Sequence, residues 1–514
     1  MKINQLEQQN HRLKQILAPL MTAAVFAAAL SAKAETPAQR AALDAQLKTR
    51  IQHIVVIYQE NWSFDSLYGQ FPGVNGLQNG FDTLPQLDKA NNYTNYIYVT
   101  PQAFNGGPDL RFPPGNGQPA LPLIPYDVTQ YASASNTTGD IIHRFYHEQL
   151  QIDNGLLEPK LSSMGKFVTW SDNPGLVLSY IDATQLPEGK LAQQYTICDN
   201  FFHSAYGGSF LNHQFLVAAA APQWLQPIPT GFQSSWDPVT RKLSDANLTI
   251  DGQFAVNTTQ GAQTPHPPTA TNKLLLPINN VDPSQPGYTP TIGNRLDDTG
   301  VSWKWYSGGW SNALAGNADP LFQYHHQPFG YYAKYAPLNP DGTLNPATTG
   351  TQAHLQDEQT FFSDVAHGAL PAVSFIKPLG PDNEHPGYAS LARGQQHVAD
   401  LVKAIQYSRF WENTVIIITY DENGGRWDHV PAPVMPDGWG LGARVPGILV
   451  SPFTKGGIID GNQYETVSIL KLIERRFSLA PLSARDANPA VSDLTSAFRF
   501  PAEFSFDRYS NAGD

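Results

Sequence analysis

The chain has 514 residues, of which 32 are basic and 44 are acidic, so its formal net charge at pH 7 is −12. A dedicated nucleic-acid-binding protein needs a basic surface, and this acidic balance argues against that class. The single cysteine, Cys198, excludes an intrachain disulfide, so the fold has to rely on its hydrophobic core.

Residues 1–34 have the features of a secretory signal peptide. A basic start is followed by an apolar stretch over residues 16–30 and by the small-residue cleavage pattern Ala32-Lys33-Ala34. We therefore expect a periplasmic or secreted protein whose mature chain starts at Glu35. A retained membrane anchor is the alternative.

The first predicted element of the fold is a buried strand over residues 51–58. It is followed by a polar turn at Glu60 and Asn61 and by a short helix over residues 63–67. The nearly continuous apolar run is typical of a parallel strand that is covered on both faces of its sheet.

Two further helices are predicted before the middle of the chain. The first covers residues 143–150 and would place His143 and His147 on one helical face, because they are four residues apart. The second covers residues 210–221 and follows the turn Gly207-Gly208-Ser209, whose glycines permit a tight bend.

Ser209 has two interpretations at this position. The N-terminus of the following helix offers free N–H groups to an anion, so the serine could attack a bound phosphate ester. Serine is also a common cap of a helix N-terminus, and the sequence leaves both interpretations open. The serine-esterase pattern G-x-S-x-G is absent, because the second residue after Ser209 is Leu211.

The region after residue 223 changes in character and is rich in Pro, Thr, Asn, Gln and turn dipeptides. We interpret it as an insertion or cap at about residues 223–345 of a single domain over residues 35–514, rather than as an independent β module. The alternation of strands and helices then resumes, which predicts an α/β fold with a mostly parallel sheet covered on both sides. The strands are expected at residues 301–306, 373–376, 415–420 and 447–450, and the helices at 394–407 and 464–477.

Hard oxygen ligands follow two of the predicted strands. Glu60 and Asn61 follow the first strand, and Asp421 and Glu422 follow the strand at residues 415–420. Because sites in open α/β sheets form outside the carboxyl ends of strands, these side chains are expected to converge. Oxygen ligands favour one divalent cation such as Ca²⁺, Mg²⁺ or Mn²⁺ over zinc. Two polar turns that cap the next helices are the alternative.

Several of the 14 histidines have positions that suit phosphate-ester chemistry. A histidine can hold phosphoryl oxygens or protonate a leaving group. His385 lies in the loop after the strand at residues 373–376, at the same end of the sheet as the oxygen ligands, and His213 follows Ser209 by four residues. For any single histidine, a structural role in a hydrogen-bonded loop is the alternative. His429 could support the loop that carries Asp421.

Two long motifs resemble the paired signatures of the phosphoesterase family, which joins bacterial phospholipases C with acid phosphatase A. They are Glu60-Asn61-x-Ser63-Phe64-Asp65 and Thr419-Tyr420-Asp421-Glu422-x-Gly424-Gly425-x-x-Asp428-His429-Val430-Pro431, and the resemblance spans residues 51–480. Residues 207–213 and 324–329 are similar to the acid phosphatase A branch. The resemblance implies an α/β/α sandwich like that of alkaline phosphatase.

The resemblance also implies a function, namely that of a secreted, metal-dependent phosphoric ester hydrolase. An acid phosphatase that forms a phosphoserine on small phosphomonoesters is the first expectation, with no obligate protein partner. A phospholipase C with a lipid substrate, a non-enzymatic phosphate or metal binder and a metal-free serine esterase are the alternatives. One metal ion would be bound by Glu60, Asn61, Ser209, Asp421 and Glu422. Ser209 would be the nucleophile, and the phosphate pocket would be lined by His143, or His147 in its place, together with His326 and His385.

Overall fold

The computed structural model describes residues 36–80, 86, 96–153 and 163–501, so the predicted signal peptide lies outside the described residues. The chain divides into two units, residues 1–49 and 50–514. The helix α2 (Pro37–Arg50) accounts for the described part of the first unit. The second unit contains the sheet and the site. Within the described residues, no helix is both long enough and apolar enough to cross a bilayer.

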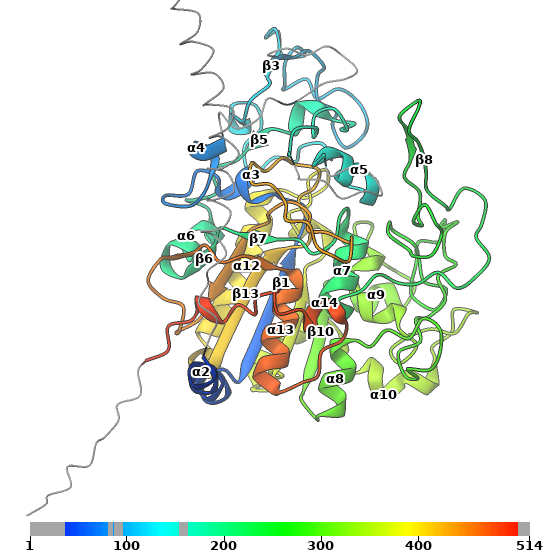
Figure 1. Ribbon diagram of the computed structural model, residues 1–514, viewed down its shortest axis with the longest axis vertical. Coiled ribbons are helices and arrows are strands. Elements are labelled where there is room, and N and C mark those ends of the chain that lie inside the picture. Colours follow the sequence, from blue (N-terminus) through cyan, green and yellow to red (C-terminus); the bar gives the residue numbers. More distant parts are fainter. Residues whose placement is uncertain (1–35, 81–85, 87–95, 154–162, 502–514) are drawn as a thin grey trace, which may run out of the picture. The chain divides into compact units, whose positions relative to one another are not determined.

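An eight-stranded sheet forms the centre of the second unit (Figure 1). Its strands are all parallel except one, β14, which runs antiparallel to both of its neighbours. The predicted α/β fold with a mostly parallel sheet is therefore confirmed. In spatial order the strands are β11 (Leu355–Asp357), β10 (Trp303–Ser307), β12 (Val373–Lys377), β1 (His53–Gln59), β13 (Thr414–Tyr420), β14 (Gly447–Val450), β6 (Thr196–Cys198) and β15 (Ile458–Asp460).

Burial of the central strands explains why apolar runs form this sheet. Residues 54–57 of β1 have no exposed surface, and the same is true of Val415, Ile416 and Ile417 in β13. Each aliphatic side chain removed from water in this way stabilises the fold by roughly 1.5–3 kcal/mol. Cys198 is buried in β6 as a free thiol.

Helices cover both faces of the sheet, as two neighbouring residues of β1 show. Tyr58 donates a hydrogen bond to the carbonyl of Asn212 in α7 on one face. Gln59 points to the other face and is paired with Tyr420, which bonds Glu188 of α6. The principal helices are α6 (Pro187–Gln194), α7 (Ser209–Ala218), α8 (Ile292–Asp298), α11 (Glu358–His367), α12 (Leu391–Gln406) and α13 (Thr466–Phe477).

Shorter elements surround this framework. Four two-stranded sheets pair β2 (Tyr96–Ile97) with β3 (Leu121–Pro122), β4 (Tyr126–Asp127) with β5 (Ser179–Tyr180), β7 (Phe201–Phe202) with β16 (Tyr464–Glu465), and β8 (Ser235–Asp237) with β9 (Lys242–Ser244). Within the described residues, the remaining α-helices are α3 (Phe64–Tyr68), α4 (Leu77–Gly80), α5 (Phe145–Gln151), α9 (Trp310–Leu314), α10 (Thr349–Gln352) and α14 (Ala484–Ala487).

Two sequence expectations need adjustment. The insertion expected at about residues 223–345 includes β10, which is a strand of the main sheet. The segment inserted before this strand therefore ends before Trp303. The helix expected from residue 143 begins at Phe145. His143 therefore precedes the helix, and the prediction that it shares a helical face with His147 was wrong.

Candidate active site

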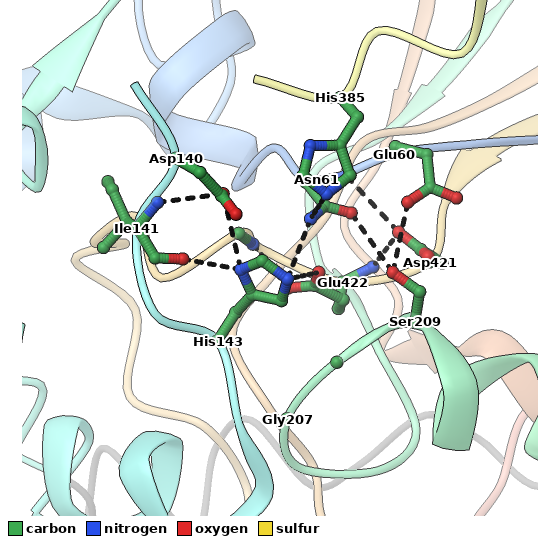
Figure 2. Close-up of polar contacts among 12 residues, drawn as sticks. Glu60, Asn61, Asp140, Ile141, His143, Gly207, Ser209, His385, Asp421 and Glu422 are labelled. Carbon is green, nitrogen blue, oxygen red and sulfur yellow. Dashed lines mark hydrogen bonds and ion pairs between the residues drawn. The ribbon is translucent and has the colours of Figure 1, made fainter. Parts of the chain in front are cut away.

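The ends of β1 and β13 bring four polar side chains together. These strands are neighbours, and Gln59 lies opposite Tyr420, so the chain leaves both strands at the same edge of the sheet. The backbone N–H of Asn61 donates to Oδ1 of Asp421 at 3.3 Å. Figure 2 shows Glu60, Asn61, Asp421 and Glu422 around one point, and all four are fully buried. The predicted convergence of the two strand ends is what the structure shows.

Ser209 is the first residue of α7 and faces this group. Its hydroxyl donates to Oε2 of Glu60 at 3.1 Å and lies 3.5 Å from Oδ1 of Asn61. The helix N-terminus behind Ser209 supplies N–H groups that favour an anion at this position.

Two glycines allow the turn before Ser209 to approach its neighbours closely. Gly207 has a φ of 84°, and a Cβ there would lie 2.5 Å from the backbone nitrogen of Phe145. A Cβ on Gly208 would lie 2.9 Å from the carbonyl oxygen of His143. The turn therefore packs directly against the segment that carries His143, and only glycine fits at residue 207 without displacement.

Asn61 connects the nucleophile to two histidines. Its side-chain amide donates to Nε2 of His385 at 3.0 Å and to Nε2 of His143 at 3.3 Å. Each histidine uses its Nδ1–H for a backbone carbonyl, that of Ile141 for His143 and that of Pro386 for His385, so both present Nε2 to the site. Asn61 itself has a φ of 65°, which asparagine tolerates better than most residues.

Glu60 lies between the nucleophile and two basic groups. Its Oε1 contacts Nε2 of His326 at 2.9 Å and the ammonium of Lys377, which is fully buried. Burial alone would raise the pKa of Glu60, but His326 and Lys377 outweigh it and hold the pKa well below its usual range. Burial also lowers the pKa of His326 to about 4, despite the charge of Glu60.

The other two carboxylates have unsatisfied oxygens. Among the described residues, neither Oδ2 of Asp421 nor Oε1 of Glu422 has a hydrogen-bond partner. Burial, followed by the charge of Glu60, raises the pKa of Asp421 to about 7, and burial, followed by the charge of Asp421, raises the pKa of Glu422 well above its usual range. A bound cation would relieve both deficits, so these residues fit a metal ion.

Histidine nitrogens lie next to these oxygen groups as well. Ligand atoms of Glu60, His213 and His326 lie within 4.8 Å of one another. His213 is fully buried, stacks on His326 with ring centroids 4.9 Å apart, and donates through Nδ1 to the carbonyl of Ser209. It thus supports the start of α7.

His147 and His429, which the sequence analysis also considered, make structural contacts. Nδ1 of His147 lies 3.0 Å from Oδ2 of Asp245, so His143, and not His147, lines the pocket. Nδ1 of His429 lies 2.6 Å from Oδ2 of Asp65. Arg444 bridges Asp65 and Asp428, so the ends of the two sequence motifs are joined by a buried ion-pair cluster.

A pocket of about 470 Å³ opens onto Ser209. Its wall includes His143, His326 and His385, as expected from the sequence. Further lining residues come from segments that the sequence did not single out: Arg144, Asn247, Val256, Asn257, Thr258, Asn272, Gln323 and Tyr388. Most of these side chains are polar, so the pocket suits a polar ligand.

Comparison with known proteins agrees with this geometry. A model described as the Phosphoesterase family matches residues 51–480. The chain belongs to the phosphoesterase family. This phosphoesterase is 25% identical over 485 residues to phospholipase C B of Mycobacterium tuberculosis, covering 88% of this chain and 78% of that protein. It is 26% identical over 500 residues to the non-hemolytic phospholipase C of Burkholderia pseudomallei, covering 88% of this chain and 59% of that protein.

Among solved structures, the phosphoesterase matches a protein in the alkaline phosphatase superfamily from Vibrio parahaemolyticus with a TM-score of 0.29 and 9% identity. The match covers 60% of this chain and 63% of that chain. Membership of this family establishes that the chain is a phosphoric ester hydrolase. The expected closeness to acid phosphatase A stays a prediction, since both relatives described above are phospholipases C.

Proposed function

We propose that this phosphoesterase hydrolyses phosphomonoesters through a phosphoserine on Ser209. The observation that carries the proposal is the position of the Ser209 hydroxyl. It lies at the N-terminus of α7, 3.1 Å from Glu60 and next to the amide of Asn61, at the base of a polar pocket. The N–H donors of the α7 N-terminus thus lie next to a nucleophile that is already hydrogen-bonded to a carboxylate.

The first step forms the bond between Ser209 Oγ and phosphorus and breaks the bond from phosphorus to the leaving oxygen. The hydroxyl proton passes to Oε2 of Glu60 along the hydrogen bond that joins the two side chains. The N–H groups at the start of α7 face the charge that develops on the phosphoryl oxygens. In the second step, water attacks the phosphoserine and the same groups act in reverse.

His385 is the better donor of a proton to the leaving oxygen. His326 is engaged by Glu60, and its pKa of about 4 makes the protonated form scarce near neutral pH. His385 lines the pocket, and its ring packs on Tyr388 with centroids 4.5 Å apart, which fixes its direction. For this role His385 has to carry a proton on Nε2, in place of the hydrogen bond that Nε2 accepts from Asn61.

Glu60, Asn61, Ser209, Asp421 and Glu422 would hold one divalent metal ion. When bound, such an ion lowers the pKa of the attacking hydroxyl and neutralises phosphoryl charge. The all-oxygen set favours Ca²⁺, Mg²⁺ or Mn²⁺, while the nearby nitrogens of His213 and His326 widen the choice.

A phospholipase C activity is the second candidate, because of an exposed apolar side chain near the pocket. Phe104 is 60% exposed, and its ring lies 6.1 Å from that of Tyr388, a pocket residue. An exposed aromatic ring at such a position suits contact with lipid. The polar pocket wall favours the phosphomonoesterase instead.

Hydrolysis of p-nitrophenyl phosphate and of p-nitrophenylphosphorylcholine tests the choice, with metal content measured on the same preparation. Fast monoester turnover with about one metal per chain is the expected result. Turnover of the diester alone would favour the phospholipase. Metal binding without turnover of either compound would favour a binding protein, and acyl-ester turnover that resists chelators would favour a serine esterase.

We also propose that the protein is exported to the periplasm or beyond. The support is the signal-like sequence of residues 1–34. Mass analysis of the protein from culture fractions tests the proposal. A chain that starts at Glu35 outside the cytoplasm is expected, and a full-length chain confined to the cytoplasm would contradict it.

A further inference from the structure

One charged side chain in the pocket wall, that of Arg144, has no ion-pair partner among the described residues. Nε of Arg144 is buried, and among the described residues it has no hydrogen-bond partner. The guanidinium forms no ion pair within the described part of the chain either, although Arg144 lines the pocket that holds Ser209. The side chain as a whole is partly exposed. A buried N–H donor without a partner is costly, so its presence points to a ligand that supplies an acceptor.

The carboxylates of Asp245 and Glu148, which lie on or against α5, are committed to other groups. Oδ2 of Asp245 accepts hydrogen bonds from the backbone N–H groups of Tyr146 and His147, each at 2.9 Å, and also contacts the His147 ring. Glu148 accepts from the backbone N–H of Gly207 and contacts His203. The negative charges around α5 are therefore used by the helix and by the nucleophile turn.

A side chain of the inserted segment before β10 holds the backbone next to Arg144 in place. Arg144 precedes the first residue of α5, and the N–H of Phe145 donates to Oδ1 of Asn257 at 3.1 Å. A Cβ on Gly207 would lie 2.8 Å from the carbonyl carbon of Arg144, so this residue packs against the turn before Ser209. The guanidinium is thus attached to a fixed point close to the nucleophile.

Arg144 and His143 are consecutive residues of the pocket wall. Arg144 has an extended backbone with φ −112° and ψ 161°, and neighbouring side chains on an extended chain point in different directions. Both nevertheless line the same pocket. His143 contacts Asn61 beside Ser209, where the reacting phosphoryl group has enough donors already.

We propose that Arg144 is a specificity-determining residue that binds a second anionic group, a carboxylate or a phosphate, on the leaving group of the substrate. The inference rests on the phosphomonoesterase function proposed above. The polar side chains of Asn247, Thr258 and Asn272 complete the wall on which such a leaving group would lie. A guanidinium suits this task because it binds carboxylate or phosphate through two parallel hydrogen bonds.

Two substrates that differ in one group test the proposal: 4-carboxyphenyl phosphate and 4-carbamoylphenyl phosphate. The wild-type protein is expected to prefer the carboxylate in kcat/KM. Arg144→Gln is expected to lower kcat/KM for the carboxylate substrate roughly 10- to 100-fold more than for the carbamoyl substrate, the range for loss of a charged hydrogen bond. Arg144→Lys should retain part of the preference. Arg241→Gln, which changes an exposed arginine, is the matched control.

Each other outcome overturns the inference. An equal loss on both substrates would place Arg144 on the reacting phosphate, and no selective loss would remove it from recognition. Turnover of neither substrate by the wild-type protein would defeat the proposed function itself, and the inference with it. If Arg144→Gln does not fold, product inhibition of the wild type decides: 4-hydroxybenzoate should inhibit at least about tenfold more strongly than 4-hydroxybenzamide, and equal inhibition would contradict the proposal.

Discussion

The close packing of the nucleophile turn makes Gly207→Ala a sensitive test of how Ser209 is positioned. An added Cβ would lie 2.5 Å from the nitrogen and 2.6 Å from the Cα of Phe145. Both are backbone atoms, so no side-chain rotation can relieve the contact. The turn and the start of α5 would have to separate by about 0.9 Å to reach an ordinary contact.

Two costs add up in this variant. Alanine in the left-handed conformation of Gly207 costs about 1–2 kcal/mol, and overpacking against backbone costs a further 1–3 kcal/mol or so. Movement of the turn also displaces the Ser209 hydroxyl from Glu60. Since a misplacement of about 1 Å can cost roughly 100-fold in rate, we expect kcat/KM to fall at least about tenfold.

Gly342→Ala is the matched control, because Gly342 has a φ of 83° and a Cβ there meets nothing within 4 Å. The Gly342→Ala variant therefore has only the cost of placing alanine in the left-handed conformation. Urea unfolding and phosphatase kinetics on both variants separate the two costs. Equal destabilisation, together with full activity in Gly207→Ala, would show that the contact with Phe145 does not hold the nucleophile in place.

Three further changes test other parts of the site and fold. Asp421→Asn should lower the metal content after dialysis, measured by elemental analysis, because it removes a charged ligand. Lys377→Met should destabilise the fold by about 3 kcal/mol in urea unfolding, since it leaves the buried charge of Glu60 with one basic partner fewer. Burial lowers the pKa of His354, but hydrogen bonds to Asp297 and to a backbone carbonyl outweigh it and raise the pKa. The raised pKa of His354 contributes less than about 1 kcal/mol to the free energy of unfolding, because the side chain is partly exposed. This contribution is present below about pH 6.5 and is lost as the pH rises. His354→Gln should therefore lower Tm more at about pH 5.5 than at about pH 8.

Exposed positions supply the controls for these variants. Asp400→Asn and Lys403→Met change an exposed ion pair on α12 and should alter neither metal content nor stability by a measurable amount. His367→Gln changes an exposed histidine on α11. Unchanged metal in Asp421→Asn, wild-type stability in Lys377→Met, or a Tm difference for His354→Gln that is the same at both pH values would each refute the corresponding argument.

The convergence of the candidate oxygen ligands was well predicted from the sequence, because it depends on a rule about sheets. Glu60 and Asp421 each follow an apolar strand, and parallel strands end at a common edge. Lys377 ends the neighbouring strand β12 in the same way, and it was missed. A lysine at a strand end usually reaches solvent, and the sequence does not reveal that β12 lies beside β1 with Glu60 next to it.

The region around α5 shows what the sequence could not reveal. The helix starts after Arg144 because Asp245 and Asn257, about a hundred residues later, accept hydrogen bonds from its first N–H groups. This long-range capping excludes His143 from the helix and directs it to the pocket. Local spacing, which placed His143 and His147 on one face, carries no information about such a contact.

The measurement that tests the account most directly is capture of the reaction intermediate on Ser209. Protein mixed with a phosphomonoester is denatured rapidly in acid, digested and analysed by mass spectrometry. We predict one added phosphoryl group on the peptide that contains Ser209, with neither label nor turnover in Ser209→Ala. Turnover by Ser209→Ala at a rate close to that of the wild type, or phosphorylation of another residue, would contradict the account.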